Sequence, residues 1–398
     1  MLVELQDVAT IVTGGTPSTT KKEYWDGDIP WLQSGCCQNC YVDKASKYIT
    51  KLGYDNSVTK MMPANTILIA LTGATAGKIG YLTFEACGNQ SITGITPDPK
   101  RLLPKFLYYC LIARRDKTVS DCTGGAQQHI SQDYVKHMKI NLPSILDQKE
   151  IVNSLDFLNQ LITKENHEHL LLDELIKSRF NEMFSKESNF VALKEITTKI
   201  TDGSHNPPKG ISSSNYIMVS SQNIFDLLDL TNVRYLTKED FELENKRTNI
   251  QDGDVLFTIV GTIGRTHVIK NEKLVFQRSV AVIKPKHNLI NSTYLKNALS
   301  STYVLEQISK AAHGVAQMGI YLSDLKELRI PLPSIDEQNE FSLFVNKVDK
   351  LKFTYPNKNL ATELILFWYC IQIMVHPSGP RHQEFFHRLH KRFCSSNN

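Results

Sequence analysis

The sequence predicts an α+β protein in which two similar mixed α/β domains are separated by long, coiled-coil helices. Three observations lead to this prediction. Five sequence blocks occur twice, in the same order, at an offset near 188 residues. Each copy alternates β-branched stretches with helical ones. Between the copies, residues 144–184 contain no Gly or Pro and repeat apolar residues every three or four positions, as a coiled-coil helix does.

In the first copy, residues 1–143, short strands and helices alternate. Thr66–Leu71 is apolar and precedes a Gly-rich turn at residues 72–80, so we predict a buried strand that ends in a hairpin or bulge. Pro104 opens a predicted helix, Pro104–Arg115. Lys139–Pro143 is a predicted short strand that its final Pro ends.

The linking helix is predicted for residues 144–187, and its pattern is regular from Ser144 to about Phe184. The Ser144 hydroxyl can accept hydrogen bonds from the free N–H groups of the first turn. A helix of about 40 residues is about 60 Å long, which exceeds the interior of an ordinary domain and predicts a spacer. One apolar stripe along it consists of Ile151, Leu155, Leu158, Ile162, Leu172 and Ile176.

The second copy, residues 188–333, repeats these elements. Asp254–Val260 predicts a buried strand before a second Gly-rich turn. Ser292–Lys310 predicts a helix that Ser292 or Thr293 opens. Arg329–Pro333 is the matching short strand.

The repeat is clearest where each copy ends. Residues 140–150 and 330–340 share an Ile-x-Leu-Pro-Ser-Ile block followed by Gln and Glu at matching positions. Four further pairs keep nearly the same offset: Leu5–Val8 with Leu193–Ile196, Leu68–Gly80 with Leu256–Arg265, Asn89–Ile92 with Gln277–Val280, and Gly125–Gln127 with Gly314–Gln317. Chance seldom preserves both order and spacing, so we interpret the chain as one domain duplicated.

A second helix begins as the repeat predicts, over residues 334–352. Pro356 then breaks the pattern, and residues 353–398 differ from the Glu-, Leu- and Lys-rich sequence that the first copy predicts. We therefore expect a truncated second helix followed by an atypical tail, as a change of reading frame or gene arm near Lys352 would produce. The alternative is a genuine docking helix in the tail.

The net charge of +4 is unevenly distributed. Residues 1–143 carry 15 Lys and Arg against 12 Asp and Glu, residues 188–333 carry 17 against 14, and residues 144–187 carry 5 against 9. Two mildly basic domains permit a polyanionic partner without requiring one. The acidic residues near the start predict no secretory signal, and residues 360–375 are too short an apolar stretch to cross a membrane. Eight Cys without regular spacing favour a reduced, cytoplasmic protein.

Two basic repeats, each closed by an Ile-x-Leu-Pro-Ser-Ile block that opens a long helix, resemble the specificity subunit of type I restriction–modification enzymes. Ile200–Pro208, with Ser220–Ile224 downstream, is similar to the start of that family's target recognition domains. Ile29–Gly35 is similar to the matching place in the first copy. The resemblance covers about residues 1–350.

This resemblance implies a non-catalytic subunit that reads a bipartite double-stranded DNA target, one half with each target recognition domain. The long helices would pack antiparallel as a spacer, and the apolar stripe would dock two adenine-N6 methyltransferase subunits. ATP-dependent restriction subunits would complete the assembly. S-adenosylmethionine, ATP and Mg²⁺ would be cofactors of those partners, and none is expected in this chain. The target bases and the spacer length do not follow from the sequence.

The residues themselves indicate no catalytic or metal site. Asn206–Pro208 lacks the aromatic residue that stacks on a flipped base in adenine methyltransferases, because Lys209 follows it. The turn at residues 72–80 is not a phosphate loop, since Ile79 stands where Ser or Thr would hold Mg²⁺. The three thiols of Cys36–Cys40 have no second ligand pair at zinc spacing.

Base edges are read by Arg, Lys, Asn, Gln, Ser and Thr, while cations and backbone amides hold phosphates. The Gly-rich turns and the loops matched between the copies carry such residues, although solvated turn residues would give the same pattern. Arg278 equally fits a buried partner of a carboxylate. The candidate DNA-binding residues are Lys21, Lys22, Gln33, Ser34, Thr72, Thr75, Lys78, Gln127, Gln128, His129, Ser220, Gln222, Asn223, Thr262, Arg265, Arg278, His313 and Gln317.

Other classes of function stay open from the sequence. The chain could itself be a methyltransferase or nuclease. It could also be a truncated specificity subunit that acts as a half-functional adaptor, or a coiled-coil adaptor whose basic domains bind proteins without DNA readout.

Overall fold

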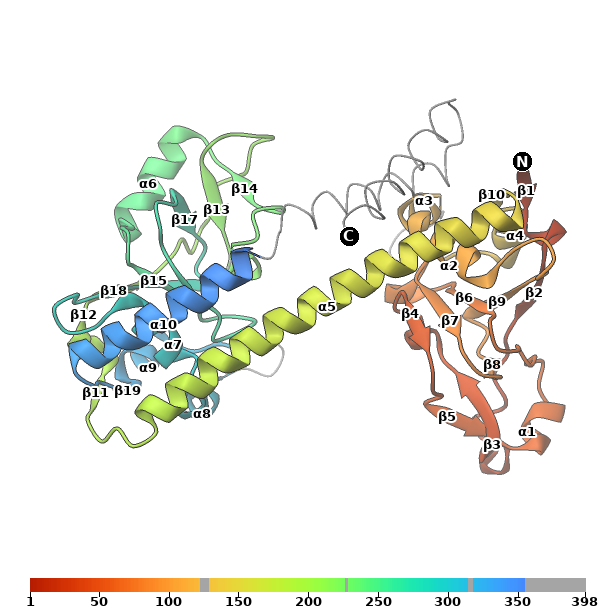
Figure 1. Cartoon of the computed structure of the whole chain (residues 1–398), viewed down its shortest axis with the longest axis horizontal. Coiled ribbons are helices and arrows are strands. Elements are labelled where there is room, and N and C mark those ends of the chain that lie inside the picture. Colours follow the sequence, from red (N-terminus) through yellow and green to blue (C-terminus); the bar gives the residue numbers. More distant parts are fainter. Residues whose placement is uncertain (122–128, 226–227, 314–317, 355–398) are drawn as a thin grey trace, which may run out of the picture. The chain divides into compact units, whose positions relative to one another are not determined.

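The computed structural model describes residues 1–121, 129–225, 228–313 and 318–354. These residues form two compact units, divided between Lys164 and Glu165 within one long helix. Each unit mixes sheets and helices, so the predicted α+β fold class is confirmed (Figure 1).

The first unit contains a five-stranded sheet of order β2-β9-β6-β7-β4, a three-stranded sheet of order β5-β3-β8, and the pair β1-β10. Its strands are β1 (Leu2–Glu4), β2 (Ala9–Thr13), β3 (Trp25–Leu32), β4 (Cys40–Val42), β5 (Lys47–Ile49), β6 (Ile67–Ala70), β7 (Ile79–Leu82), β8 (Cys87–Gly88), β9 (Ile92–Pro97) and β10 (Lys139–Asn141). Its helices before the long one are α1 (Lys51–Asp55), α2 (Pro104–Ala113), α3 (Arg115–Ser120) and α4 (Gln132–Lys136).

Strand β6 lies at the centre of the first unit, and both of its faces are buried. Ile67 and Ile69 pack with Phe106 of α2 in one cluster, whereas Leu68 and Ala70 belong to a second cluster. A strand covered on both faces needs apolar residues at every position, which explains its continuous apolar run. Strands β6 and β7 pair antiparallel and form the predicted hairpin.

The second unit repeats this plan with a four-stranded sheet of order β12-β18-β15-β16, a three-stranded sheet of order β14-β13-β17, and the pair β11-β19. Its strands are β11 (Phe190–Ala192), β12 (Thr197–Asp202), β13 (Ile217–Val219), β14 (Arg234–Tyr235), β15 (Val255–Thr258), β16 (Thr266–Val268), β17 (Leu274–Phe276), β18 (Val280–Pro285) and β19 (Arg329–Pro331). Its shorter helices are α6 (Lys238–Thr248), α7 (Ser292–Leu299), α8 (Thr302–Ala311) and α9 (Leu322–Glu327).

The helix predicted for Ser292–Lys310 is two helices, α7 and α8, so that prediction was wrong in extent. Ser300 is the C-cap residue of the first, and Ser301 caps the second, because its hydroxyl accepts from the amide of Val304. Asn291, rather than Ser292 or Thr293, caps α7 through its side-chain oxygen. A polar pair inside a helical pattern can begin a new helix as well as continue an old one.

The long helix α5 (Ile145–Phe184) has 40 residues and begins as predicted. The Ser144 hydroxyl accepts from the amide of Asp147, whose carboxylate accepts from the Ser144 amide in return. Near its start, Leu155 is fully buried in the core of the first unit, and near its end Phe180 lies in the core of the second.

In the second unit α5 packs antiparallel to α10 (Ile335–Thr354), as Figure 1 shows. Phe180, late in α5, contacts Phe341, early in α10. Asp173, earlier in α5, pairs with Lys352, late in α10, at 2.5 Å. Residues 355–398 lie outside the described residues, so the predicted truncation of this helix stays a prediction.

The structure corrects the proposed docking stripe on α5. Leu155, Leu158 and Ile176 are buried, and Leu155 and Ile176 belong to the cores of this chain's own units. Ile151, Ile162 and Leu172 are only partly exposed. The amphipathic pattern therefore indicates packing within the chain. The apolar side chains that α5 exposes are on another part of its surface: Leu170, Leu171 and Leu175 are 62%, 49% and 46% exposed.

A buried glutamine explains why the Ile-x-Leu-Pro-Ser-Ile block ends each copy. Gln148 is fully buried, accepts from the Leu103 amide at 2.8 Å and donates to the carbonyls of Arg101 and Pro143. Gln338 does the same with Asn291, Leu289 and Pro333. A buried carboxamide is stable only when its polar atoms are paired. These two side chains thus fix each helix to the domain that precedes it.

Candidate functional site

In each unit, loops that are distant in sequence converge at the end of the central strand. We call this the loop cluster. In the first unit it comprises residues 14–18, 33–38, 72–78, 88–91 and 129–131. In the second it comprises residues 203–206, 220–223, 259–265, 277–279 and 318–320. It contains most of the described residues that the sequence singled out.

Backbone hydrogen bonds join these loops, and the same bonds occur in both units. In the first unit they are Gly15 N to Gly88 O (2.8 Å), Asn89 N to Leu32 O (2.9 Å), Leu71 N to Ser91 O (2.8 Å) and Ile130 N to Leu71 O (2.8 Å). In the second they are Ser204 N to Phe276 O (2.7 Å), Gln277 N to Val219 O (3.0 Å), Ile259 N to Ser279 O (2.9 Å) and Ile320 N to Ile259 O (2.9 Å). The duplication thus extends to individual bonds.

The first loop cluster brings several predicted residues together. Thr72 pairs with His129 in an isolated β-bridge. Lys78 donates to the Gln38 carboxamide at 2.6 Å and so joins the Gly-rich turn to the loop of Gln33 and Ser34. Thr75 lies in the same Gly-rich turn.

Lys21 and Lys22 are exposed and follow residues 14–18 of the first loop cluster. Lys21 donates to the Tyr24 hydroxyl at 2.9 Å, and this hydrogen bond raises the pKa of Lys21. Both side chains are exposed and therefore accessible to a polyanion.

The second loop cluster has the same construction. Gly261 donates its amide to the Met318 carbonyl, and His313 pairs with Gly319, so the turn that holds Thr262 meets residues 318 and 319. The Ser221 amide donates to the Ser279 hydroxyl at 3.0 Å, which places the exposed Gln222 beside the turn of Arg278. The Arg265 guanidinium lies 4.1 Å from the centre of the Phe225 ring.

Some candidates have a different role in the structure. Asn223 is 5% exposed, donates to the carbonyls of Asp229 and Asn232, and accepts from the amide of Ser220. The Ser220 hydroxyl also bonds to Asn223. These two side chains shape their own loop, and we no longer expect Asn223 to contact DNA. Gln127, Gln128 and Gln317 lie outside the described residues.

Arg278 is exposed and forms no ion pair with the described residues, so the alternative of a buried carboxylate partner was wrong.

Sequence reasoning missed a charged group at the second loop cluster. Asp202, at the end of β12, pairs with Arg247 of α6, and His205 Nε2 lies 2.7 Å from its other oxygen. Burial would raise the pKa of Asp202, but the hydrogen bonds from Arg247 and His205 outweigh it and hold the pKa below its ordinary value. Asp202 and Arg247 are 45 residues apart in the chain. The sequence signal was the motif Ile200–Pro208, which contains Asp202 and which was interpreted only as a resemblance.

This group does not form a hydrolytic triad. The Ser204 hydroxyl donates to Glu244 at 3.0 Å and is not bonded to His205. A serine nucleophile needs a base within hydrogen-bond reach of its hydroxyl. Among the described residues there is also no group of three or more His, Cys, Asp or Glu side chains placed to hold a metal ion.

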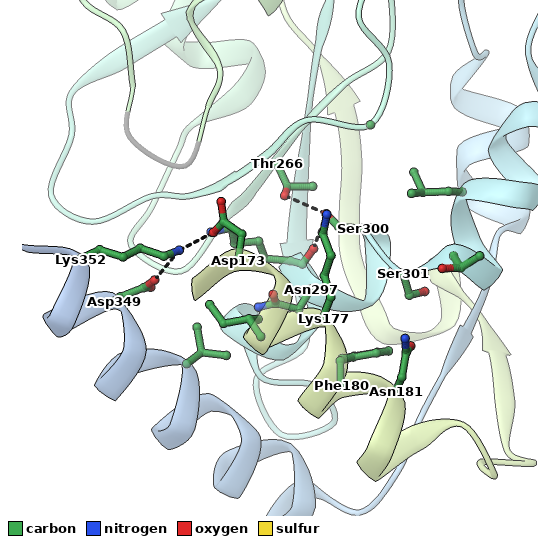
Figure 2. Close-up of a pocket in the computed structure, with 16 residues that line it drawn as sticks. Asp173, Lys177, Phe180, Asn181, Thr266, Asn297, Ser300, Ser301, Asp349 and Lys352 are labelled. Atoms are coloured by element: carbon green, nitrogen blue, oxygen red, sulfur yellow. Dashed lines mark hydrogen bonds and ion pairs between the residues drawn. The ribbon is translucent and has the colours of Figure 1, made fainter. Parts of the chain in front are cut away.

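A cavity of about 380 Å³ lies in the second unit among α5, α10, α7 and α8. Figure 2 shows Lys352 of α10 directed toward Asp173 of α5 and Asp349 of its own helix. Its acidic side chains are thus paired with a lysine of the same wall. The contacts join two packed helices, and of the second loop cluster only Gly264 is among the residues that line the cavity.

Comparisons with known proteins agree with the duplicated domain. A family model, the type I restriction modification DNA specificity domain, matches residues 1–172 and again residues 186–363. The specificity subunit of the type I restriction enzyme EcoprrI from Escherichia coli is 25% identical over 376 residues, which cover 87% of each chain. The MjaIX specificity subunit from Methanocaldococcus jannaschii is 26% identical over 213 residues, 50% of this chain, and the match spans about half of that protein, 48%.

The crystal structure of a type I restriction–modification S subunit from M. genitalium has the same fold. It is 15% identical, with a TM-score of 0.52, over 94% of this chain and 95% of its own. No helix in the described part of the present chain has the length and apolar character needed to span a membrane.

Proposed function

The chain belongs to the type I restriction–modification DNA specificity family, and from that premise we propose that it is the subunit that reads the DNA target and performs no chemistry itself. Each loop cluster would contact one half of a bipartite double-stranded site. The observation that carries the proposal is the loop cluster itself, built twice with the same backbone bonds and with polar and cationic side chains at its surface.

The loop clusters have the chemical groups that DNA recognition requires. Lys21, Lys22 and Arg265 supply positive charge near the loops, and mild net basicity of both domains favours a polyanion. Exposed Gln222, Thr262 and similar side chains can hydrogen-bond base edges. Hydrogen bonds between neighbouring loops hold the backbone in place, so little conformational entropy is lost when DNA binds.

Methyltransferase and restriction subunits would be the protein partners, and they would bring S-adenosylmethionine, ATP and Mg²⁺. Exposed apolar side chains on α5 support a protein interface there, because Leu170, Leu171 and Leu175 lie close together in the sequence and are 62%, 49% and 46% exposed. The length of α5, about 60 Å at 1.5 Å per residue, would set the number of unread base pairs between the half-sites.

Selection of binding sites from random duplex DNA tests this function. The full chain, assembled with the methyltransferase subunit of the same system, should enrich a split sequence with a fixed gap. Binding should weaken steeply as salt rises, since phosphate contacts release counterions. A pool that stays random after selection would contradict the proposal, as would methyl transfer to DNA by this chain alone.

A further inference from the structure

The two loop clusters have the same scaffold but present different side chains at one matched position. The turn at residues 88–91 presents Gln90, and the turn at residues 276–279 presents Arg278. The positions are structurally equivalent, because the same backbone hydrogen bond closes both turns. In the first turn the Ile92 amide donates to the Asn89 carbonyl at 3.1 Å, and in the second the Val280 amide donates to the Gln277 carbonyl at 3.0 Å.

This turn is held rigidly. In the second unit the Arg278 amide donates to the Ser204 carbonyl at 2.9 Å. Its neighbours Gln277 and Ser279 form backbone hydrogen bonds with Val219 and Ile259, which lie in two other segments. Gly203 packs so closely that a Cβ atom there would lie 2.1 Å from the Phe276 carbonyl oxygen. In the first unit a Cβ on Gly14 would lie 2.1 Å from the Gly88 oxygen. A side chain on a fixed turn can hold a defined position toward a ligand.

Both side chains remain available for a ligand. Arg278 is exposed, and its guanidinium has no hydrogen bond or ion pair to the described residues, whereas the nearby Arg247 is paired with Asp202. Gln90 is exposed and accepts from the Thr16 hydroxyl at 2.5 Å, which orients its carboxamide. Among the described residues, the Gln90 amide hydrogens and the second lone pair of its oxygen have no hydrogen-bond partner.

We propose that Gln90 and Arg278 are equivalent base-reading residues, Gln90 for an adenine in one half-site and Arg278 for a guanine in the other. The inference rests on the proposed function and goes further by naming the residues and the bases. A carboxamide donates to N7 and accepts from N6 of adenine, and a guanidinium donates to both N7 and O6 of guanine. Two domains that share a scaffold but read different sequences must differ at the residues that touch bases, and this position differs.

The test uses the full chain assembled with its methyltransferase subunit and the target found by selection from random DNA. For Arg278→Gln we expect discrimination at one guanine of one half-site to fall roughly 5- to 100-fold. The other half-site should be unchanged. Gln90→Arg should change one adenine position in the opposite half-site.

Two variants control this experiment. Lys270→Gln also removes one positive charge, but at the far end of the β15–β16 hairpin, where residue 269 bonds to Asp254, and it should leave the target unchanged. Arg278→Lys keeps a donor for guanine and should keep the base preference with weaker binding. If thermal unfolding shows that Arg278→Gln does not fold, Arg278→Lys still tests this position.

Three results would overturn the inference. Arg278→Gln with an unchanged target would show that the side chain reads nothing. Weaker binding to all sequences alike, with a salt dependence reduced by about one unit, would make Arg278 a phosphate contact. If the unmodified chain selects a target and Arg278→Gln alters both half-sites equally, the two turns are not separate readers. A wild-type assembly without any sequence preference would instead reject the proposed function itself.

Discussion

The two domains of this chain share the backbone hydrogen bonds of their loop clusters and differ in the charge at the ends of the matching edge strands β2 and β12. In the first, Thr13 and Thr93 face each other through their hydroxyls at 3.2 Å. In the second, the matching end of β12 has Asp202 paired with Arg247 and His205. The scaffold therefore does not dictate the surface of the loop cluster, and the surface can diverge without loss of the fold.

A second difference explains how the charged group is supported. Helix α6 has 11 residues, whereas its counterpart α1 has five. The last turn of the longer helix carries Arg247, which also donates to the Asp202 carbonyl at 2.9 Å. The greater length of α6 in the second domain thus provides the buried Asp202 carboxylate with a charged partner.

If the shared scaffold stabilises each domain, substitution of the buried glutamines should cause the largest loss of stability. Gln148→Ala or Gln338→Ala leaves three backbone groups unpaired and a cavity, and should lower the free energy of unfolding by about 3 kcal/mol. Hydrogen exchange should rise mainly in the domain that contains the substitution. Gln6→Ala, at an exposed glutamine bonded to Glu4, is the control and should change exchange in neither domain. Equal loss of protection in both domains would mean that their stabilities are not independent.

The close approach of the turns gives a smaller effect that should again be domain-specific. A Cβ atom at Gly14 or Gly203 would displace the neighbouring carbonyl, so each Ala substitution should cost about 2 kcal/mol of unfolding free energy. Gly35→Ala is the matched control, since nothing lies within 4 Å of its Cβ position. Denaturant unfolding measures the difference, and unaltered midpoints for both Gly14→Ala and Gly203→Ala would refute the packing described for the turns.

The charged group should give the second domain a pH dependence at Asp202 that the first lacks. Because the pKa of the Asp202 carboxyl is below its ordinary value, its contribution is fully present above about pH 4 and is lost as the pH falls through the folded-state pKa. Asp202→Asn should therefore destabilise the chain by about 1 kcal/mol at neutral pH and have no effect at the most acidic pH. Unfolding of the two proteins across this pH range measures it. A difference that stays constant with pH would contradict this account.

The smallest effect is expected where α5 meets the first domain. Asp156 accepts from Lys105 at 2.6 Å and from the Tyr109 hydroxyl at 2.7 Å, whereas α5 meets the second domain through the stacked rings of Phe180 and Tyr294. Asp156→Asn keeps the size of the side chain and removes the charge. We expect a loss of about 0.5 kcal/mol, because the Lys105 ammonium is partly solvated. Sodium chloride at 1 M should abolish the difference between the variant and the unmodified chain in a denaturant titration.

The repeat, the fold class and the long helix could be predicted from the sequence because each leaves a local pattern. Alternation of spacing identified α5 to within a residue of its start, and the repeated block marked where each domain ends. The role of Gln148 inside that block was not predictable, because its partner Leu103 is 45 residues earlier in the chain. The break between α7 and α8 was also missed, since Ser300 and Ser301 fit a helix as well as a cap.

The site was predicted only in part, for a similar reason. Sequence pattern named Thr72 and His129 separately, but their pairing depends on tertiary structure. The apolar stripe on α5 was interpreted as a docking surface although Ile176 packs within the chain, because periodicity does not distinguish an internal partner from an external one. Gln90 was not singled out, because its position gains meaning only when the two turns are matched bond by bond.

Sequencing of DNA methylation in a host that carries the system tests the central claim most directly. The account predicts a split adenine-containing motif, two specific halves and a fixed gap, that disappears when the gene for this chain is deleted and returns when it is restored. A continuous motif, or a methylation pattern that deletion leaves unchanged, would contradict the claim that two duplicated domains read two halves of one target.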